Sequence, residues 1–298
     1  MINGLLVVDK PIDWTSHDVI AKLRSIFKQK KIGHTGTLDP MATGVLVVCL
    51  GRFTKLVDRI TAMTKTYEVE FDLGYETDTE DKTGTIINTS KLNPDKTKIK
   101  EVIYSFIGEQ EQVPPMYSAI KVDGKKLYEL ARKGEFININ ARLINIYNIY
   151  NIMIDELHIK MTVECSKGVY IRSLVRDIGR KLGCYACMTK LRRTRVGSYS
   201  IDQSYTINEI EMNPQCLLDI RQILPEMKKI YAIEKADKLL INGNQIPINY
   251  IKEDVANGEY LLYDSKDNLF GIYEAKNDKI YPSIILYTEI GSTGKNLL

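Results

Sequence analysis

Alternation between apolar and polar positions predicts the strands of this chain. From Tyr67 to Leu73 every second residue is apolar and the residues between them are acidic, a period of two that is typical of a strand buried on one face. The segment 158–165 alternates in the same way, and the apolar run 45–50 predicts a buried strand. A short strand from residue 4 ends at Pro11. The isoleucine- and asparagine-rich stretch near residue 150 is predicted as strand because β-branched and aromatic residues dominate it.

Apolar residues three and four positions apart predict the helices. Thr15 or Ser16 can cap a first helix, and the segments 53–63 and 99–106 repeat with helical spacing. A later helix opens near residue 171 and has an apolar stripe on one face. A second face of that helix carries arginines at intervals of four: Arg172, Arg176 and Arg180.

The chain of 298 residues is long enough for one large domain and one small one. We predict a larger α+β domain over residues 1–231 and a small β-rich domain over residues 232–298. The composition changes near Pro225, after which acidic residues outnumber basic ones and the pattern predicts short strands that alternate with turns. Within the larger domain, residues 114–136 give a proline-rich approach, a strand, a turn at Asp123–Gly124 and a short basic helix that ends near Gly134.

Charge is unevenly distributed in a chain whose formal net charge is only +3. The segment 165–195 holds nine Lys or Arg residues against one acid, and the segment 22–31 holds five basic residues and no acid. A solvated helix face would explain either cluster alone. Two such clusters on a nearly neutral protein favour a directed anionic partner.

The composition, 44% hydrophobic and 27% charged, is that of a soluble globular protein. No apolar run approaches the ~20 residues that span a bilayer, and the N-terminus lacks the pattern of a signal peptide. We therefore expect a cytoplasmic protein that does not enter a membrane. Cys184 and Cys187 are the only closely spaced pair of cysteines, and without nearby histidines they predict structural thiols and no metal site. The P-loop, nucleophile-elbow and dinucleotide motifs are missing, which favours chemistry without a cofactor.

The segment GHTGTLDPMATGVL, residues 33–46, contains four glycines or prolines in a short span, which is typical of a shaped loop. Its glycines can adopt positive φ, and Pro40 fixes its own φ and biases Asp39 toward an extended conformation. A single carboxylate is therefore held on a stiff loop at the edge of a buried strand. On composition alone, a simple turn would explain Asp39 and Pro40 equally well.

The opening of the arginine-bearing helix is a second candidate site. Tyr170 and Arg172 lie in its first turn, where unpaired backbone N–H groups and the helix dipole favour an anion. An arginine at this place could hold a carboxylate such as Asp39 in a bidentate pair, or contact phosphate.

Taken together, these segments resemble the TruB-type tRNA pseudouridine-55 synthases. Six blocks match the family in order and cover most of residues 4–197: the strand ending in DKP, GHTGTLDPMATGVL, KTYEVEFDLGYETDTEDKTG, VPPMYSAIKVDGKKLYELARKG, CSKGVYIRSLVRDIGRKLG and LRRTRVG. The resemblance implies the pseudouridine synthase fold, α+β with a mixed, mainly antiparallel central sheet flanked by helices. It also implies that residues 114–136 form an RNA-contacting insertion and that residues 232–298 form a PUA-like domain.

The resemblance implies roles for three residues at the centre of the site. Asp39 matches the catalytic aspartate of the family, Arg172 matches the arginine paired with it, and Tyr67 matches the tyrosine packed against the target base. Each residue alone has a simpler explanation, as a turn, a solvated helix residue or a core tyrosine. Their joint occurrence in matching blocks favours the functional interpretation.

Four further residues match substrate-binding positions of the family. Tyr170 and Leu191 match residues that line the uridine pocket, and Asp81 matches an acid that contacts the flipped nucleotides. His34 matches the histidine beside the space that the extruded base leaves. A loop histidine could also simply form a hydrogen bond with its own backbone.

The implied reaction is the isomerisation of a uridine in the T-arm of tRNA, position 55, with no cofactor and no metal. The N1–C1′ bond breaks, the uracil rotates, and C5 rejoins C1′; Asp39 could attack C1′, attack C6 or remove a sugar proton. The expected partner is the T-arm stem-loop of tRNA, bound by a monomer with no obligate protein partner. Two alternatives are a non-catalytic RNA-binding protein and a related synthase guided by an H/ACA RNA, although the chain lacks long basic tails.

Overall fold

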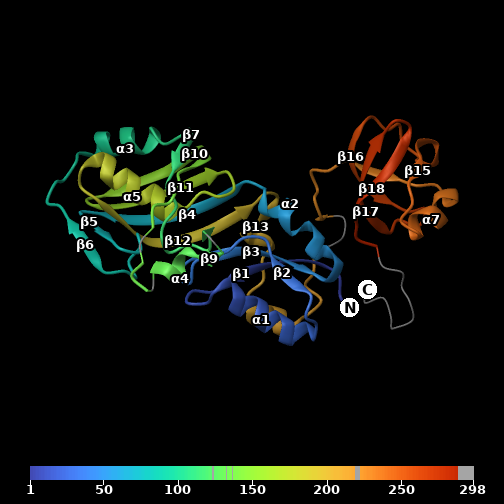
Figure 1. Ribbon diagram of the computed structural model, residues 1–298, viewed down its shortest axis with the longest axis horizontal. Helices are drawn as coiled ribbons and strands as arrows, with labels where there is room; N and C mark the ends of the chain where they lie inside the picture. Colours follow the sequence, from blue (N-terminus) through green and yellow to red (C-terminus); the bar gives the residue numbers. More distant parts are fainter. Residues whose placement is uncertain (123, 132, 136, 219–221, 288–298) are drawn as a thin grey trace.

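A nine-stranded sheet forms the centre of the fold in the computed structural model, which describes residues 1–122, 124–131, 133–135, 137–218 and 222–287 (Figure 1). Within the described residues, β3 and β12 are the only neighbouring strands of this sheet that run parallel. The sheet is therefore mixed and mainly antiparallel, as predicted. Its strands follow in the order β1 (Gly4–Lys10), β3 (Thr43–Leu50), β12 (Ala186–Val196), β4 (Lys65–Leu73), β11 (His158–Cys165), β10 (Arg142–Asp155) and β7 (Gly108–Gln112), with β2 (Ile32–His34) beside β3 and β13 (Tyr199–Ser200) beside β12.

The alternating pattern of the sequence decides which face of β4 and β11 is buried. Tyr67 lies opposite Val163 in the register of the two strands, and both side chains belong to the main hydrophobic cluster. The intervening residues, such as Glu68 and Lys160, point to the opposite face of the sheet, since successive side chains of a strand alternate. One face of this part of the sheet is therefore core and the other is polar.

Helices α5 (Ile171–Leu182) and α3 (Lys96–Tyr104) lie together over β4, β11 and β10 (Figure 1). Gly183 ends α5 in the left-handed conformation, with φ of 76°. The helix α3 begins earlier than the apolar spacing predicted, because the Asp95 side chain accepts hydrogen bonds from the backbone N–H groups of Thr97 and Lys98.

The larger region also contains several shorter helices and a small separate pair of strands. Thr15 caps α1 (Ser16–Phe27) and forms a capping box with Asp18, as one of the two predicted caps. The remaining short elements are η1 (Gly51–Leu56), α2 (Val57–Thr61), η2 (Ile201–Gln203), α6 (Ile207–Met212) and the small strand pair β5 (Tyr75–Thr77) with β6 (Ile86–Thr89).

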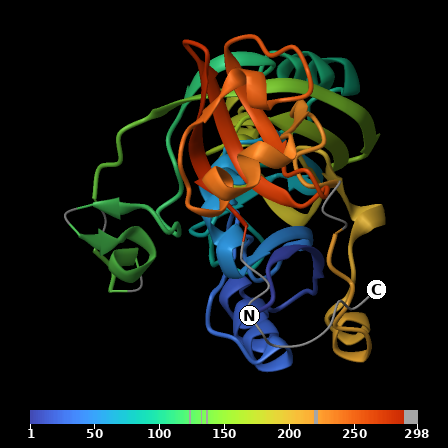
Figure 2. The same cartoon turned by 90° about the vertical axis from the view of Figure 1, so that its right-hand side faces the viewer.

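The predicted insertion projects from one side of the body (Figure 2). It carries the strand pair β8 (Lys121–Val122) and β9 (Lys125–Lys126), followed by α4 (Leu127–Ala131). Of the predicted turn, residue 123 lies outside the described residues, and Gly124 has a positive φ of 80°. Gly134, with φ of 75°, donates its N–H to the carbonyl of Ala131 at the end of the helix, where the sequence placed its end.

The C-terminal region forms a second sheet of five strands beside η1 and α2 (Figure 1). Its first strand begins at Lys229, three residues before the domain boundary predicted from composition. Arg59 of α2 holds Glu259 through two hydrogen bonds of 2.7 and 2.6 Å, and Leu261 and Ile272 share a hydrophobic cluster with Val45. The elements of this region are β14 (Lys229–Tyr231), α7 (Glu234–Ile241), β15 (Ile246–Pro247), η4 (Ile248–Tyr250), β16 (Gly258–Tyr263), β17 (Leu269–Lys276) and β18 (Lys279–Ile285).

We predict that Gly44→Ala separates β3 from β12 and destabilises the fold. Gly44 has φ of 100°, and a Cβ atom there would lie 2.2 Å from the carbonyl oxygen of Arg193. Backbone strain and overpacking together should lower the free energy of unfolding by about 3 kcal/mol, as measured by urea denaturation. Gly108→Ala is the matched control, because φ there is 112° but no atom lies within 4 Å of the added carbon. Equal losses in the two variants would show that the close contact with Arg193 carries no cost.

Candidate active site around Asp39

The loop between β2 and β3 is held in shape by two buried cations. The Lys10 ammonium donates to the carbonyl of Pro40 at 3.1 Å, and to the carbonyls of Pro11 and Trp14. Arg193 donates from Nη2 to the carbonyl of Gly36 at 3.1 Å and from Nε to that of Val45 at 2.7 Å. Because these bonds fix the loop at both ends and beside Asp39, the carboxylate has a defined position.

The Asp39 carboxylate and the Arg172 guanidinium form a bidentate pair. Arg172 approaches Oδ2 of Asp39 through Nε at 2.9 Å and donates to Oδ1 through Nη2 at 3.0 Å. The same guanidinium donates to the carbonyls of Thr79 at 3.0 Å and Tyr117 at 2.8 Å. An arginine with this many fixed acceptors cannot rotate away without losing several charge-assisted hydrogen bonds. Of the two partners predicted for this arginine, a carboxylate and phosphate, the structure has the carboxylate.

Burial and the nearby cations act in opposite directions on the pKa of Asp39. Burial raises the pKa of Asp39 above its ordinary value, the Arg172 guanidinium lowers it, the Asp81 carboxylate raises it, and Lys10 lowers it. The side chain of Asp39 keeps 33% of its surface exposed, whereas Arg172 keeps 5%. The pair therefore presents a carboxylate that is reachable from outside and backed by a buried cation. Such a group can act as a nucleophile or as a base.

Two apolar residues predicted for the site lie beside the Asp39 loop. Tyr67 of β4 and Leu191 of β12 are both buried, at 7% and 5% exposure, in a cluster that includes Leu38 and Met41 from the loop itself. Burial raises the pKa of Tyr67, so its phenol is neutral, and the nearby Arg193 guanidinium opposes this shift. The site thus has an apolar wall next to its carboxylate.

Tyr170 occupies the N-cap position of α5. Its side chain is half-buried, and burial raises its pKa. The side-chain amide of Gln112 brackets the Tyr170 backbone, accepting from its N–H at 2.8 Å and donating to its carbonyl at 3.1 Å. These bonds fix the residue that opens the arginine-bearing helix.

His34 and Asp81 lie near the site with their polar atoms engaged by their own loops. His34 Nδ1 accepts from the backbone N–H of Gly36 at 3.3 Å, the alternative that the sequence left open. Burial lowers the pKa of His34 to about 4, so its ring is neutral at physiological pH. The Asp81 carboxylate accepts from Thr79 and Thr83, and it lies 3.9 Å from Nε of Arg172.

Sequence reasoning missed the two buried cations that support the loop. The signal for Lys10 is a charge at the end of an otherwise apolar strand, and that for Arg193 is one arginine among several in a basic strand. Lys10 is fully buried, and burial lowers its pKa to about 8. A buried ammonium or guanidinium needs partners, which here are backbone carbonyls.

The larger basic cluster is divided between the interior and the surface: Arg172, Arg176 and Arg193 are buried, Arg192 is half-buried, and the other five members are exposed. Within the part of the chain that the structure describes, Lys167 and Arg195 are the only two of its nine cations without a hydrogen-bond, ion-pair or ring partner. Arg180 pairs with Glu76 at 3.1 Å, for example. The buried arginines of the cluster therefore serve the fold, and its exposed members stay available for the anionic partner that the sequence predicts.

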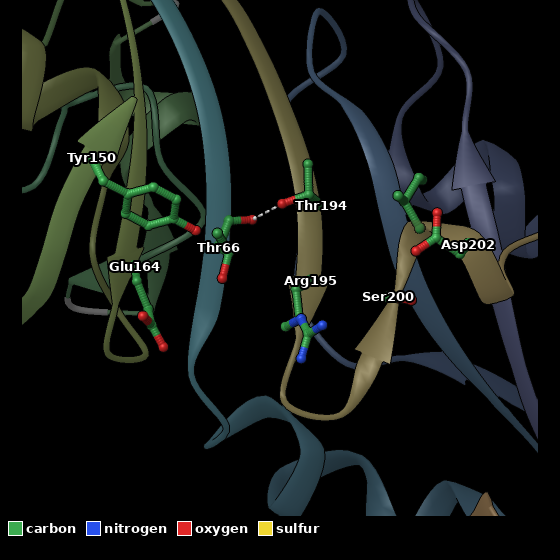
Figure 3. A pocket seen from close by; sticks show the side chains of 8 residues that line it. Thr66, Tyr150, Glu164, Thr194, Arg195, Ser200 and Asp202 are labelled. Atoms are coloured by element: carbon green, nitrogen blue, oxygen red, sulfur yellow. Dashed lines mark hydrogen bonds between the residues drawn. The ribbon is translucent and has the colours of Figure 1, made fainter. Parts of the chain in front are cut away.

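A pocket of about 360 Å³ lies on the opposite, polar face of the sheet (Figure 3). It is lined by Thr66 and Glu164, which alternate with the buried Tyr67 and Val163 along β4 and β11. Because strand side chains alternate between faces, this pocket and the Asp39 site are separated by the sheet.

Two further features bear on the predictions from sequence. Among the described residues, no group of three His, Cys, Asp or Glu side chains is placed to hold a metal ion. No described helix has the length and apolar character needed to cross a membrane.

Comparison with known proteins identifies the family. The model described as the TruB family pseudouridylate synthase N-terminal domain matches residues 24–171, and that of the tRNA pseudouridylate synthase B C-terminal domain matches residues 172–221. The tRNA pseudouridine synthase B of Clostridium novyi is 43% identical over 285 residues, which is 94% of this chain and 98% of that protein. The Bacillus subtilis protein of the same name is 46% identical over 222 residues, 72% of each chain.

Solved structures share the fold. The chain superposes with a TM-score of 0.74 and 22% identity on a protein from an H/ACA RNP bound to a substrate RNA containing 2′-deoxyuridine, over 96% of this chain and 86% of that one. A chain of a Cbf5–Nop10–Gar1 complex gives a TM-score of 0.71 at 24% identity, over 96% and 84%. The structures show the fold, and the extent of the sequence matches shows that the chain belongs to the TruB family of pseudouridylate synthases.

Proposed function

We propose that this protein isomerises the uridine at position 55 in the T-arm of tRNA to pseudouridine, with Asp39 as the catalytic residue. The observation that carries the proposal is the bidentate Asp39–Arg172 pair, which presents a partly exposed carboxylate beside an apolar wall. Relatives that match nearly the full length of the chain are named tRNA pseudouridine synthase B.

The reaction needs a carboxylate and a shaped pocket, and it conserves all atoms of the nucleotide. The N1–C1′ bond breaks, the uracil rotates while it is held, and a C5–C1′ bond forms. The proton on C5 is lost and N1 gains one, so hydrogen at C5 exchanges with solvent. Attack at C1′, attack at C6 and removal of a sugar proton all require an ionised Asp39, which the Arg172 guanidinium favours.

The target base has to leave the stack of the T-loop to reach Asp39. Extrusion costs a few kcal/mol, and contact with an aromatic side chain offsets about 1–3 kcal/mol of this. Tyr67 would pack against the uracil, with Tyr170 and Leu191 lining the pocket around it. All three lie on elements that meet at the Asp39 loop, β4, α5 and β12.

His34 and Asp81 would act around the base and not on it. A neutral imidazole beside the loop is suited to fill space that the extruded base leaves, because it carries no charge that needs solvation. Asp81 would contact the flipped nucleotides with an oxygen of its carboxylate, which is 7% exposed beside Arg172.

We further propose how the rest of the chain serves this reaction. Residues 114–136, which project from the body (Figure 2), would contact the T-arm stem-loop, and residues 232–298 would form a PUA-like domain attached to the catalytic region 1–231. The enzyme would act as a cytoplasmic monomer with tRNA as its partner, since one chain supplies Asp39, Arg172 and Tyr67 together.

Asp39→Asn should abolish turnover and leave folding and RNA binding nearly intact. The amide keeps the shape of the carboxylate and can still accept from Arg172, but it can serve neither as nucleophile nor as base. Tritium release from a tRNA transcript labelled at C5 of uridine, with the site mapped to the T-arm, should fall at least about a thousandfold. Normal rates in the variant would refute the role of Asp39, and tight binding without release by the wild type would favour a non-catalytic RNA-binding protein.

Arg172→Ala should cost both activity and stability. It leaves Asp39 and Asp81 close together without their shared cation, and loss of one partner of a buried pair costs about 3–5 kcal/mol. Because Asp39 is partly exposed, we expect the lower end of this range for the free energy of unfolding, measured by thermal denaturation. Arg180→Ala is the matched control on the same helix: its side chain is 53% exposed and its partner Glu76 keeps the hydrogen bond from Asn88, so we expect a smaller loss of about 1–2 kcal/mol. Unchanged melting of the Arg172 variant would argue against the ion pair.

His34 should make stability depend on pH. The unfolded chain binds a proton at His34 near pH 6.5, while in the folded protein burial lowers the pKa to about 4. The free energy of unfolding should therefore fall as pH falls through this window, by at most about 1.4 kcal/mol per pH unit and less because the ring is partly exposed. Urea denaturation of His34→Gln should give a flatter curve than wild type, whereas His17→Gln, which removes an exposed neighbour, should keep most of the slope. A slope unchanged by His34→Gln would contradict this assignment.

A further inference from the structure

A second buried ion pair lies one helical turn beyond the Asp39–Arg172 pair. Arg176 of α5 contacts Oε1 of Glu80 through Nη1, and the side chains of Arg176 and Glu80 are only 10% and 12% exposed. Ser173 donates its hydroxyl to the other oxygen of Glu80 at 2.9 Å. Arg176 also donates from Nε to Asp177 at 2.8 Å. Nothing in the proposed reaction uses this pair directly.

The pair lies next to the two backbone segments that hold Arg172. Glu80 directly follows Thr79, whose carbonyl accepts from Arg172 Nη1 at 3.0 Å. On the other side, Arg176 Nη2 donates to the carbonyl of Val113 at 3.1 Å, four residues before Tyr117, the second carbonyl acceptor of Arg172 at 2.8 Å. The Arg176 guanidinium therefore contacts both chain segments whose carbonyls orient the Arg172 guanidinium.

We propose that Arg176 and Glu80 are positioning residues of the reaction, which hold the Thr79 and Tyr117 carbonyls so that Arg172 stays bidentate on Asp39. This inference rests on the proposed function. The Arg172 guanidinium is fixed by its acceptors, and two of these are carbonyls of non-helical segments that α5 does not hold through its own backbone. A displacement of about 1 Å in a catalytic group can cost about a hundredfold in rate.

The third arginine of the same helix face offers a comparison within the molecule. Arg180 pairs with Glu76 through Nε at 3.1 Å, so three arginines at intervals of four each face an acid from the segment 76–81. Glu76 is buried, but the Arg180 side chain is 53% exposed and contacts neither Thr79 nor Val113. A purely structural role for the arginine series would make Arg176 and Arg180 alike in their effect on catalysis.

The experiment compares Arg176→Gln with Arg180→Gln by tritium release from the labelled tRNA transcript. We expect Arg176→Gln to lower kcat about tenfold or more while KM changes by less than about threefold, and Arg180→Gln to keep kcat within about twofold. Burial and Asp81 raise the pKa of Asp39, and Arg172 and Lys10 lower it. If Arg172 is less firmly held, its lowering effect weakens and the pKa of Asp39 rises. The acid limb of the kcat profile should then move to higher pH in Arg176→Gln alone.

A second variant separates positioning from folding. Arg176→Gln leaves Glu80 buried without its counter-charge, so the double variant Arg176→Met with Glu80→Leu removes both charges and keeps the volume. The inference predicts the same loss of kcat and the same shift of the acid limb at a melting temperature close to wild type. A double variant with the kcat and acid limb of the wild type would overturn it, as would equal effects of Arg176→Gln and Arg180→Gln. Absence of turnover in the wild type would instead refute the proposed function.

Discussion

A carboxylate that has to be both reachable and ionised is the constraint on which this structure depends. Water would keep Asp39 ionised but would not hold it in place, and burial alone would favour its protonated form. The bidentate contact with Arg172 meets both needs, because a planar guanidinium fixes the position of the carboxylate as well as its charge. The cost is a buried cation, which the protein offsets with the carbonyls of Thr79 and Tyr117.

Much of the fold could be predicted from periodicity, because burial on one face leaves a direct trace in the sequence. The alternation of β4 and the cap of α1 are local signals, and both elements form where they were expected. The start of α3 was missed by three residues because the cap, Asp95, precedes the first apolar position. The second sheet begins three residues before the predicted boundary at residue 232, because β14 is defined by its pairing with β16 and not by local composition.

The site could be predicted only in part. The helix-terminus argument brought Arg172 toward a carboxylate, and the family resemblance supplied the remaining residues. The supports of the loop were not foreseen: Arg193 reaches Val45 across 148 positions of sequence, and no local pattern marks such a contact. For the same reason, a count of charges could not separate the exposed members of the basic cluster from Arg176, which pairs with Glu80 inside the protein.

The hydrophobic cluster between the two sheets has a consequence for how this architecture can evolve. Leu261, Tyr263 and Ile272 of the C-terminal sheet share this cluster with Phe53 and Leu56 of η1 and Ile60 of α2, the elements that directly follow β3. A C-terminal unit joined only by a linker could be exchanged, lost or duplicated as a module. Here its removal would uncover apolar side chains of η1 and α2, so any replacement must bring an apolar face that fits the same elements. Substitutions in the C-terminal sheet and in the part of the larger region that it contacts are therefore expected to depend on each other.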